Sequence, residues 1–96
     1  MSRDYFINDA RGQRHASEKE LPLPVGGKDL AGIVIPGLEA DQLLAHIALS
    51  QGHAYIQPAG NYDSLYHNDE RLTDSAWLKS GDRIQIGDYV MSWEVK

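Results

Sequence analysis

The sequence contains no cysteine, no long apolar run and no excess of basic residues. Without cysteine there can be no disulfide, no thiolate metal ligand and no cysteine nucleophile. No apolar run approaches the roughly 20 residues that a membrane-spanning helix needs, and residues 1–8 lack the apolar core of a signal peptide. We therefore expect no direct membrane insertion, and a location in the cytoplasm or on the cytoplasmic face of a membrane-attached protein.

The charge of the chain is acidic and unevenly distributed. The net charge is −5, and residues 31–96 carry all of it, with nine acidic against four basic side chains. A nucleic-acid-binding surface needs a basic stripe, so we expect no nucleic-acid partner. An anionic membrane surface is disfavoured for the same reason.

The length of 96 residues allows one hydrophobic core and not two. We expect a single domain over residues 1–96, in which residues 1–20 form an N-terminal hairpin and residues 21–96 form the main core. The sequence stops directly after an expected strand, so we also expect this domain to be part of a longer protein.

The clearest local pattern lies near the C-terminus. Apolar residues alternate with polar ones on both sides of a turn at Gly87-Asp88, which is typical of a β-hairpin. The alternating residues are Ile84, Ile86, Tyr89, Met91 and Trp93. We expect both tryptophans of the chain, Trp77 and Trp93, to lie in the core.

Shorter patterns predict further strands. Residues 45–50 and 53–57 alternate with period two around Ser50-Gln51-Gly52, which favours a second hairpin with at most a short helical turn before it. Residues 64–67 and 71–72 flank a tight turn. Proline interrupts residues 21–25, so we expect an edge strand there at best. Turn signals every few residues predict an all-β sandwich or barrel.

Five segments, in order along residues 23–95, together resemble the forkhead-associated (FHA) domain family. They are Gly27-Lys28 where the family has Gly-Arg, the strand 32–36, His46 of a Ser-x-x-His motif, the turn 68–72, and the closing pattern L-x-x-G-D-x-I-x-I-G at 78–87. The resemblance implies an FHA-like β-sandwich of two packed, mostly antiparallel sheets that binds other proteins, in many members at phosphothreonine. It also implies structural roles for Gly27, His46, Asn68, Gly81, Asp82 and Gly87, with the imidazole of His46 buried and tying loops together.

The sequence departs from the family at the residues that hold phosphothreonine. In members that bind it, an arginine and a serine reach the phosphate, and an asparagine in a second loop holds the peptide backbone. Here Lys28 replaces the arginine and loses its planar fork. Leu43 stands where the serine is expected, and Asp63-Ser64 stands where Asn-Gly is usual. Phosphate recognition needs converging charge-assisted donors, so the resemblance implies a degenerate site.

The expected binding edge consists of the loops 26–29, 38–44 and 59–65. Its candidate binding residues are Lys28, Leu43, Leu44, Tyr62, Asp63 and Ser64. Lys28 fits either contact with an anionic partner or simple solvation. The two leucines fit either an exposed apolar patch or inward packing. Tyrosine is enriched at interfaces, and Tyr55, Tyr62 and Tyr66 are candidates for this reason.

Catalytic and metal sites are not supported. The remaining histidines, His15, His53 and His67, lack metal-ligand spacing, and no nucleophile elbow or phosphate-binding loop is present. We expect no enzyme activity, no metal and no cofactor.

Three functions stay open. The first is a non-catalytic protein–protein interaction module whose partner is another protein or another part of the full-length chain. The second is a phosphothreonine reader in which Lys28 and Ser64 replace the missing donors. The third is a structural or oligomerisation domain, and the oligomeric state stays undetermined.

Overall fold

The structure, a computed structural model, describes residues 4–9, 11–30, 32–59 and 64–95. Within these ranges the chain forms β-strands, two short 3₁₀-helices (η1, Glu18–Glu20, and η2, Lys28–Leu30) and no α-helix. The strands are β1 (Asp4–Asp9), β2 (Gly12–Ser17), β3 (Leu23–Gly26), β4 (Ile33–Val34), β5 (Leu43–Ser50), β6 (His53–Pro58), β7 (Leu65–His67), β8 (Glu70–Arg71), β9 (Ala76–Trp77), β10 (Asp82–Ile86) and β11 (Tyr89–Val95).

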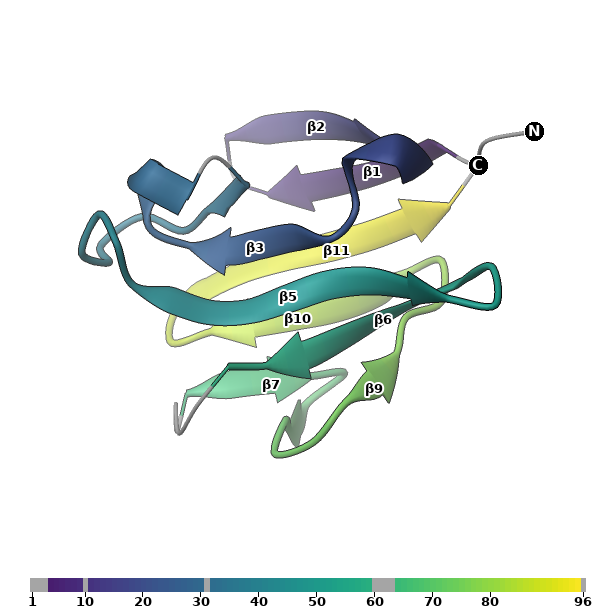
Figure 1. Cartoon of the computed structure of the whole chain (residues 1–96). Coiled ribbons are helices and arrows are strands. Elements are labelled where there is room, and N and C mark those ends of the chain that lie inside the picture. The colour runs from purple at the N-terminus through teal and green to yellow at the C-terminus, as the bar shows by residue number, and fades with distance from the viewer. Residues whose placement is uncertain (1–3, 10, 31, 60–63, 96) are drawn as a thin grey trace.

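The strands form two sheets that face each other (Figure 1). Sheet A has the order β2-β1-β11-β10-β7-β8, and sheet B has the order β4-β3-β5-β6-β9. Every pairing is antiparallel except that of β3 with β4 among the described residues. The predicted all-β sandwich of two mostly antiparallel sheets is confirmed.

The hairpins that the sequence predicts are present. β1 pairs with β2 from Asp4↔Ser17 to Asp9↔Gly12, β5 with β6 from Ala45↔Pro58 to Ser50↔His53, and β10 with β11 around Gly87. Each hairpin joins neighbouring strands of one sheet, because a short turn can only return the chain antiparallel to itself.

Two strands differ from expectation. β3 is not an edge strand: it lies between β4 and β5, because Pro24 removes a single backbone donor and β4 pairs only with Val25 and Gly26. β5 begins at Leu43 rather than at residue 45, so the expected loop 38–44 ends two residues earlier.

The core lies between the sheets and is built from the inward-facing residues of both. The rings of Tyr5 and Trp93 stack in it with centroids 4.8 Å apart, and both residues are 1% exposed. The core placement of Trp77 is wrong. This residue is 57% exposed, because on β9 it is Ala76 that faces inward, in register with the buried Ile56.

Candidate functional site

Several connections between strands meet at one end of the sandwich (Figure 1). They are the β3–β4 connection with η2, the β4–β5 connection, the end of β6, the start of β7 and the β10–β11 turn. We call this end the loop edge. Loops carried by a rigid sheet sandwich are free to vary without disturbing packing, so such an end is a common place for binding residues.

Gly27 holds the first two of these loops together. Its N–H donates to the carbonyl of Gln42 at 2.8 Å, and the N–H of Asp29 donates to the carbonyl of Ala40 at 2.8 Å. A Cβ atom on Gly27 would lie 2.0 Å from the carbonyl oxygen of Glu39, closer than two non-bonded atoms can approach. Glycine is therefore required here by the close approach of two backbones.

Lys28 follows directly and begins η2. Its side chain is exposed and forms no hydrogen bond or ion pair with any residue that the structure describes. The lysine is thus an exposed cation at the loop edge whose amine has no partner among the described residues.

Ser64 lies at the same end but on sheet A, directly before β7. Its carbonyl accepts a hydrogen bond from the N–H of Gly87 at 3.0 Å, which joins the segment directly before β7 to the β10–β11 turn. Lys28 and Ser64 therefore reach the loop edge from opposite sheets. Tyr62 and Asp63, the other candidates in this loop, lie outside the described residues.

Leu43 and Leu44 do not form an exposed apolar patch in a loop. Both belong to β5, where Leu43 is half-buried and in register with Gly26, and Leu44 is 2% exposed in the core. The expectation that they contact a ligand is wrong for Leu44, because the inward face of the strand takes its side chain.

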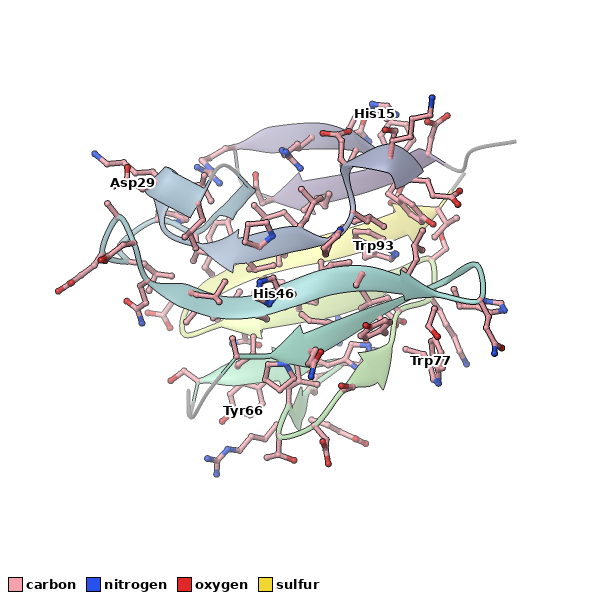
Figure 2. All side chains as sticks on the ribbon, in the orientation of Figure 1. His15, Asp29, His46, Tyr66, Trp77 and Trp93 are labelled. Carbon is pink, nitrogen blue, oxygen red and sulfur yellow. The ribbon has the colours of Figure 1, made fainter. Side chains whose placement is uncertain are left out.

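His46 is not buried either. From Ala45 onward the side chains of β5 alternate, and Ala45 and Ile47 are fully buried, so His46 between them points outward, in register with Pro24 and Gln57 (Figure 2). The expected role of a buried imidazole that ties loops together is therefore wrong.

The sequence interpretation missed a polar cluster beside the loop edge. Tyr89 donates its hydroxyl to Asp9, and the guanidinium of Arg11 donates to the carbonyl of Val34 at 2.6 Å and contacts the Tyr89 hydroxyl at 3.2 Å. Burial opposes ionisation of Asp9, but the bonds from Tyr89 and Arg11 outweigh it and lower the pKa of this carboxyl. The cluster joins the β1–β2 turn to β4 and β11; the separation of these residues in the chain hid it.

Asn68 and Asp82 form a second network at the other end of β7. The Nδ2 atom of Asn68 donates to Asp82 at 3.1 Å, and its Oδ1 atom accepts from the N–H of Arg83 at 2.8 Å. Asp82 also bonds His67 Nε2 and the N–H of Lys79, each at 2.8 Å. Asn68 has a φ of 49°, a conformation that asparagine tolerates in tight turns.

The environment of Asp82 favours its ionised form. Partial burial raises the pKa of this carboxyl, but the hydrogen bonds from Lys79, His67 and Asn68 outweigh burial and lower it overall. Its partners lie in two turns and at the end of β7, so the carboxylate acts as a local clamp between them. Gly81, which precedes it, has a φ of 94°, and Gly87 in the next turn has a φ of 59°.

The described residues contain no cluster of metal-ligating side chains. No group of three or more histidine, aspartate or glutamate side chains is placed to hold a metal ion in this part of the chain. The helices that the structure describes are also too short and too polar to cross a membrane.

Comparison with known proteins places the fold. The chain matches EmbR of Mycobacterium tuberculosis, solved with a low-affinity phosphopeptide, at a TM-score of 0.77 and 17% identity, covering 95% of this chain and 24% of that one. It matches the FHA domain of CT664 from Chlamydia trachomatis at a TM-score of 0.77 and 11% identity, covering 95% of this chain and 96% of that one. It matches the Rv0020c FHA structure at a TM-score of 0.74 and 17% identity, covering 98% of this chain and 94% of that one.

The chain therefore has the fold of an FHA domain. No family model matches the sequence, and no curated protein does. The chain spans about a quarter of EmbR but nearly the whole of the two isolated FHA structures, so the likeness concerns one domain.

Proposed function

We propose that this chain is a non-catalytic protein-interaction module whose loop edge contacts another protein, or another part of a longer chain, without requiring phosphothreonine. The fold supports an interaction module, since the similar EmbR was solved with a bound phosphopeptide. The observation that carries the proposal is Lys28, an exposed cation without a partner among the described residues, fixed at the loop edge by the Gly27 contacts.

The departures from the phosphothreonine-binding pattern support the claim that the loop edge does not require phosphothreonine. Leu43 offers no hydroxyl and is half-buried on β5. A lone lysine is a point charge, whereas firm phosphate binding uses several charge-assisted donors that converge. The loop edge therefore suits a protein surface with an acidic patch better than a single phosphate group.

A phosphothreonine reader is the second candidate, and one observation favours it. The segment η2, which begins at Lys28, and the start of β7, which Ser64 precedes, lie at the same end of the sandwich (Figure 1). Backbone N–H donors between them would have to supply the phosphate contacts that an arginine and a serine make in phosphothreonine-binding members of the family.

A chemical-shift titration separates these functions. The ¹⁵N-labelled chain is titrated with a degenerate phosphothreonine peptide pool and with its unphosphorylated counterpart. The proposal expects no saturable shift at Lys28 or Ser64 that depends on phosphate, and saturable shifts there with the phosphorylated pool alone would replace it by the reader.

A capture experiment tests the loop edge itself. Lys28→Ala should weaken binding of partner proteins, whereas Lys19→Ala, at another exposed lysine in η1, should not. Equal capture by both variants would remove the loop edge from consideration.

A further inference from the structure

Arg14 is a charged residue on the inner face of sheet A. It stands directly opposite Ile7 in the pair of β1 and β2, and directly opposed residues share one face of a sheet. Ile7 is 3% exposed, and Ala16, two residues after Arg14 on the same face, is 0% exposed, so this face belongs to the core. A cation on such a face is expected to have a partner, because an unpaired charge is costly to bury.

The guanidinium of Arg14 has no partner among the residues that the structure describes. Its Nη1 atom is buried and forms no hydrogen bond, and no described carboxylate forms an ion pair with it. Two other arginines are paired, Arg11 with Asp9 at 3.3 Å and Arg83 with Asp69 at 2.8 Å. Arg14 is therefore a partly buried cation whose donors remain unused within the described part of the chain.

A pocket of about 210 Å³ lies beside this guanidinium, at the open side of the sandwich between β2 and β4. These two strands are the edges of sheet A and of sheet B. Gly12 also lines the pocket and leaves space in it, because a Cβ atom there would meet nothing within 4 Å. Its other main lining residues are apolar, Ile7, Ile33 and Val34, or charged, Asp9, Arg11 and Arg14.

The charges of the pocket favour an occupant with a single negative charge. Arg11 and Asp9 neutralise each other as an ion pair, so Arg14 leaves one unpaired positive charge. A dianionic phosphate would face the Asp9 carboxylate with only this one free cation to hold it, whereas a carboxylate matches the charge. The planar guanidinium pairs with a carboxylate through two parallel N–H donors. The apolar walls suit the methylene stem of an acidic side chain.

The outer edge of β2 offers backbone groups beside this pocket. β2 pairs with β1 on one side, and it is the outermost strand of sheet A (Figure 1). The N–H of Ser17 donates to the Glu20 carboxylate at 2.7 Å and so points away from β1. Because the direction alternates along an antiparallel strand, the N–H groups of Gln13 and His15 also point away from β1. Groups of this kind can pair with an added strand.

We propose that β2 pairs with an extended segment of a partner protein, and that a glutamate or aspartate of this segment pairs with the Arg14 guanidinium at the pocket. On an added strand, the residue directly opposite Arg14 lies on the same face, with its Cβ atom about 5 Å away. Its neighbours two positions away face the open space at Gly12 and the buried Ala16, where apolar residues fit. The partner sequence is therefore an acidic residue with an apolar residue two positions before and after it.

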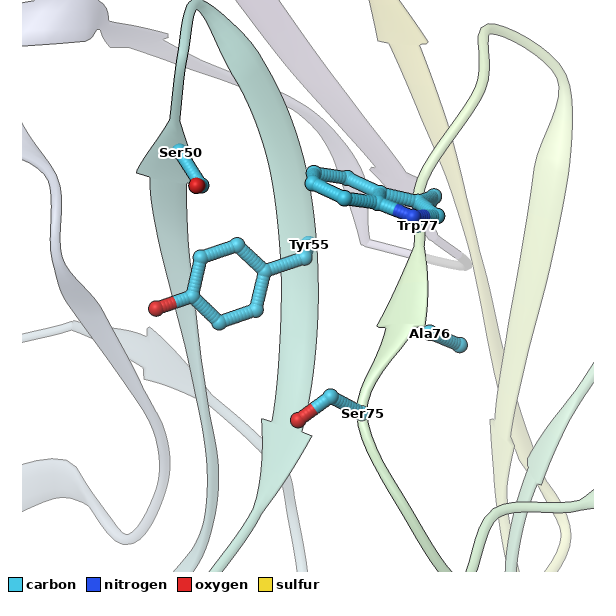
Figure 3. A pocket seen from close by; sticks show the side chains of 5 residues that line it. All are labelled: Ser50, Tyr55, Ser75, Ala76 and Trp77. Atoms are coloured by element: carbon cyan, nitrogen blue, oxygen red, sulfur yellow. The ribbon is translucent and has the colours of Figure 1, made fainter.

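This surface is distinct from the loop edge and from the largest hollow of the described residues. Neither Lys28 nor Ser64 lines the pocket at Arg14. The larger hollow, of about 270 Å³, contains only uncharged side chains and offers a carboxylate no counter-charge (Figure 3). Its lining residues are Ser50, Tyr55, Ser75, Ala76 and Trp77. The indole of Trp77 is therefore an internal reference that the proposed ligand should leave unchanged.

A titration of the ¹⁵N-labelled chain tests the proposal, followed at the Nε–H signal of Arg14 and the amides of Gln13 and His15. The main probe is a peptide with blocked ends, Thr-Val-Thr-Glu-Thr-Val-Thr. The comparisons are the same peptide with glutamine in place of glutamate, acetate, and inorganic phosphate. We expect saturable shifts with the glutamate peptide and binding of the glutamine peptide that is at least about tenfold weaker, because a charge-assisted pair is lost.

Three variants locate the effect. Arg14→Gln should remove the preference for the glutamate peptide, and it should fold normally because no described residue bonds the guanidinium. Arg83→Gln is the matched control, because Arg83 is an exposed arginine of the same sheet and should leave the preference intact. Gln13→Pro removes an N–H that points away from β1, so it should weaken both peptides while the β1–β2 pairing stays intact.

Several results would overturn the proposal. They are an absence of shifts with the glutamate peptide, equal binding of the two peptides, or a preference for glutamate that Arg14→Gln leaves intact. Acetate binding as tight as that of the peptide would assign the pocket to small free carboxylates, and a stronger response to phosphate would assign it to a dianion. A concentration-dependent dimer that Gln13→Pro dissociates, with no response to either peptide, would assign the edge of β2 to a second copy of the chain. Lys28→Ala should change none of these titrations, so this proposal and the proposed function fail separately.

Discussion

The Oδ2 atom of Asp82 lies 2.8 Å from Nε2 of His67, and this contact joins the start of β10 to the end of β7. The two side chains are only 13% and 18% exposed. The same carboxylate accepts the N–H of Lys79 and the amide of Asn68, so one residue organises two turns that are distant in sequence.

Substitution of Asp82 should therefore cost stability. Asp82→Ala removes the carboxylate partner of His67, Asn68 and Lys79, of which His67 is partly buried, and we expect a loss of about 1–3 kcal/mol in the free energy of unfolding. Urea unfolding measures this. Asp69→Asn is the matched control, because it removes the exposed ion pair with Arg83, which should contribute at most about 1 kcal/mol, and asparagine tolerates the φ of 71° at this position. Equal effects of the two variants would contradict the clamp role.

The lowered pKa of Asp82 makes this contribution depend on pH. The folded-state pKa lies below the ordinary value of 3.8, so ionised Asp82 stabilises the fold fully above that value. The contribution is lost as the pH falls through the folded pKa. The stability difference between the wild type and Asp82→Asn should thus be constant near neutrality and shrink below about pH 4. A difference that stays constant into strong acid would show that the charge of Asp82 is not involved.

The two tryptophans should respond oppositely to truncation. Trp93→Ala empties the centre of the core and removes the stack with Tyr5, so we expect a loss of about 3–5 kcal/mol. Trp77→Ala removes a largely exposed ring and should change stability by no more than about 0.5 kcal/mol. Thermal or urea unfolding of both variants checks this. A large loss for Trp77→Ala would mean that its exposed ring has a packing role.

Gly27 should be intolerant of any side chain. Gly27→Ala forces the loops 26–30 and 39–42 apart, because the new Cβ would meet the carbonyl of Glu39 at 2.0 Å. We expect a loss of about 1–3 kcal/mol and shifted amide signals in both loops. Lys28→Ala, one residue further on, should leave stability unchanged because its side chain is exposed. A stable Gly27→Ala variant with unshifted signals would contradict the tight contact.

The sequence predicts strands correctly where apolar and polar residues alternate clearly with period two. The hairpin at Gly87 was predictable because apolar residues alternate on both sides of a turn with glycine at positive φ. Trp77 was misplaced because β9 has only two residues, too few to show any alternation. For His46 the alternation of residues 45–50 predicts an outward side chain, and the structure shows one. The family resemblance implied a buried side chain, which is wrong for this chain.

The candidate site was less predictable than the fold. Its loops contain no repeating pattern. Their positions depend on backbone contacts such as that between Gly27 and Gln42, which no local sequence pattern predicts. The polar cluster of Asp9, Arg11 and Tyr89 joins residues about 80 positions apart and was inaccessible for the same reason. The edge-to-face contact between the rings of Tyr55 and Trp77 likewise depends on the pairing of β6 with β9.

Restoring the missing donors should create phosphothreonine binding if the loop edge has only lost them. The double variant Lys28→Arg with Leu43→Ser supplies a planar fork and a hydroxyl at the positions where the family resemblance places them. A hydrogen bond to a charged group contributes about 1.5–3 kcal/mol, so the pair should strengthen binding of a phosphothreonine peptide by tenfold or more. The titration with the phosphorylated and unphosphorylated pools measures this directly. Lys28→Arg with Ala48→Ser is the matched control, because Ala48 lies on β5 but faces the outer surface of sheet B, in register with Tyr55. If both double variants gained equally, the effect would come from arginine alone, and if neither gained, the position of Leu43 on β5 would be too far inside the strand for a serine there to reach a ligand.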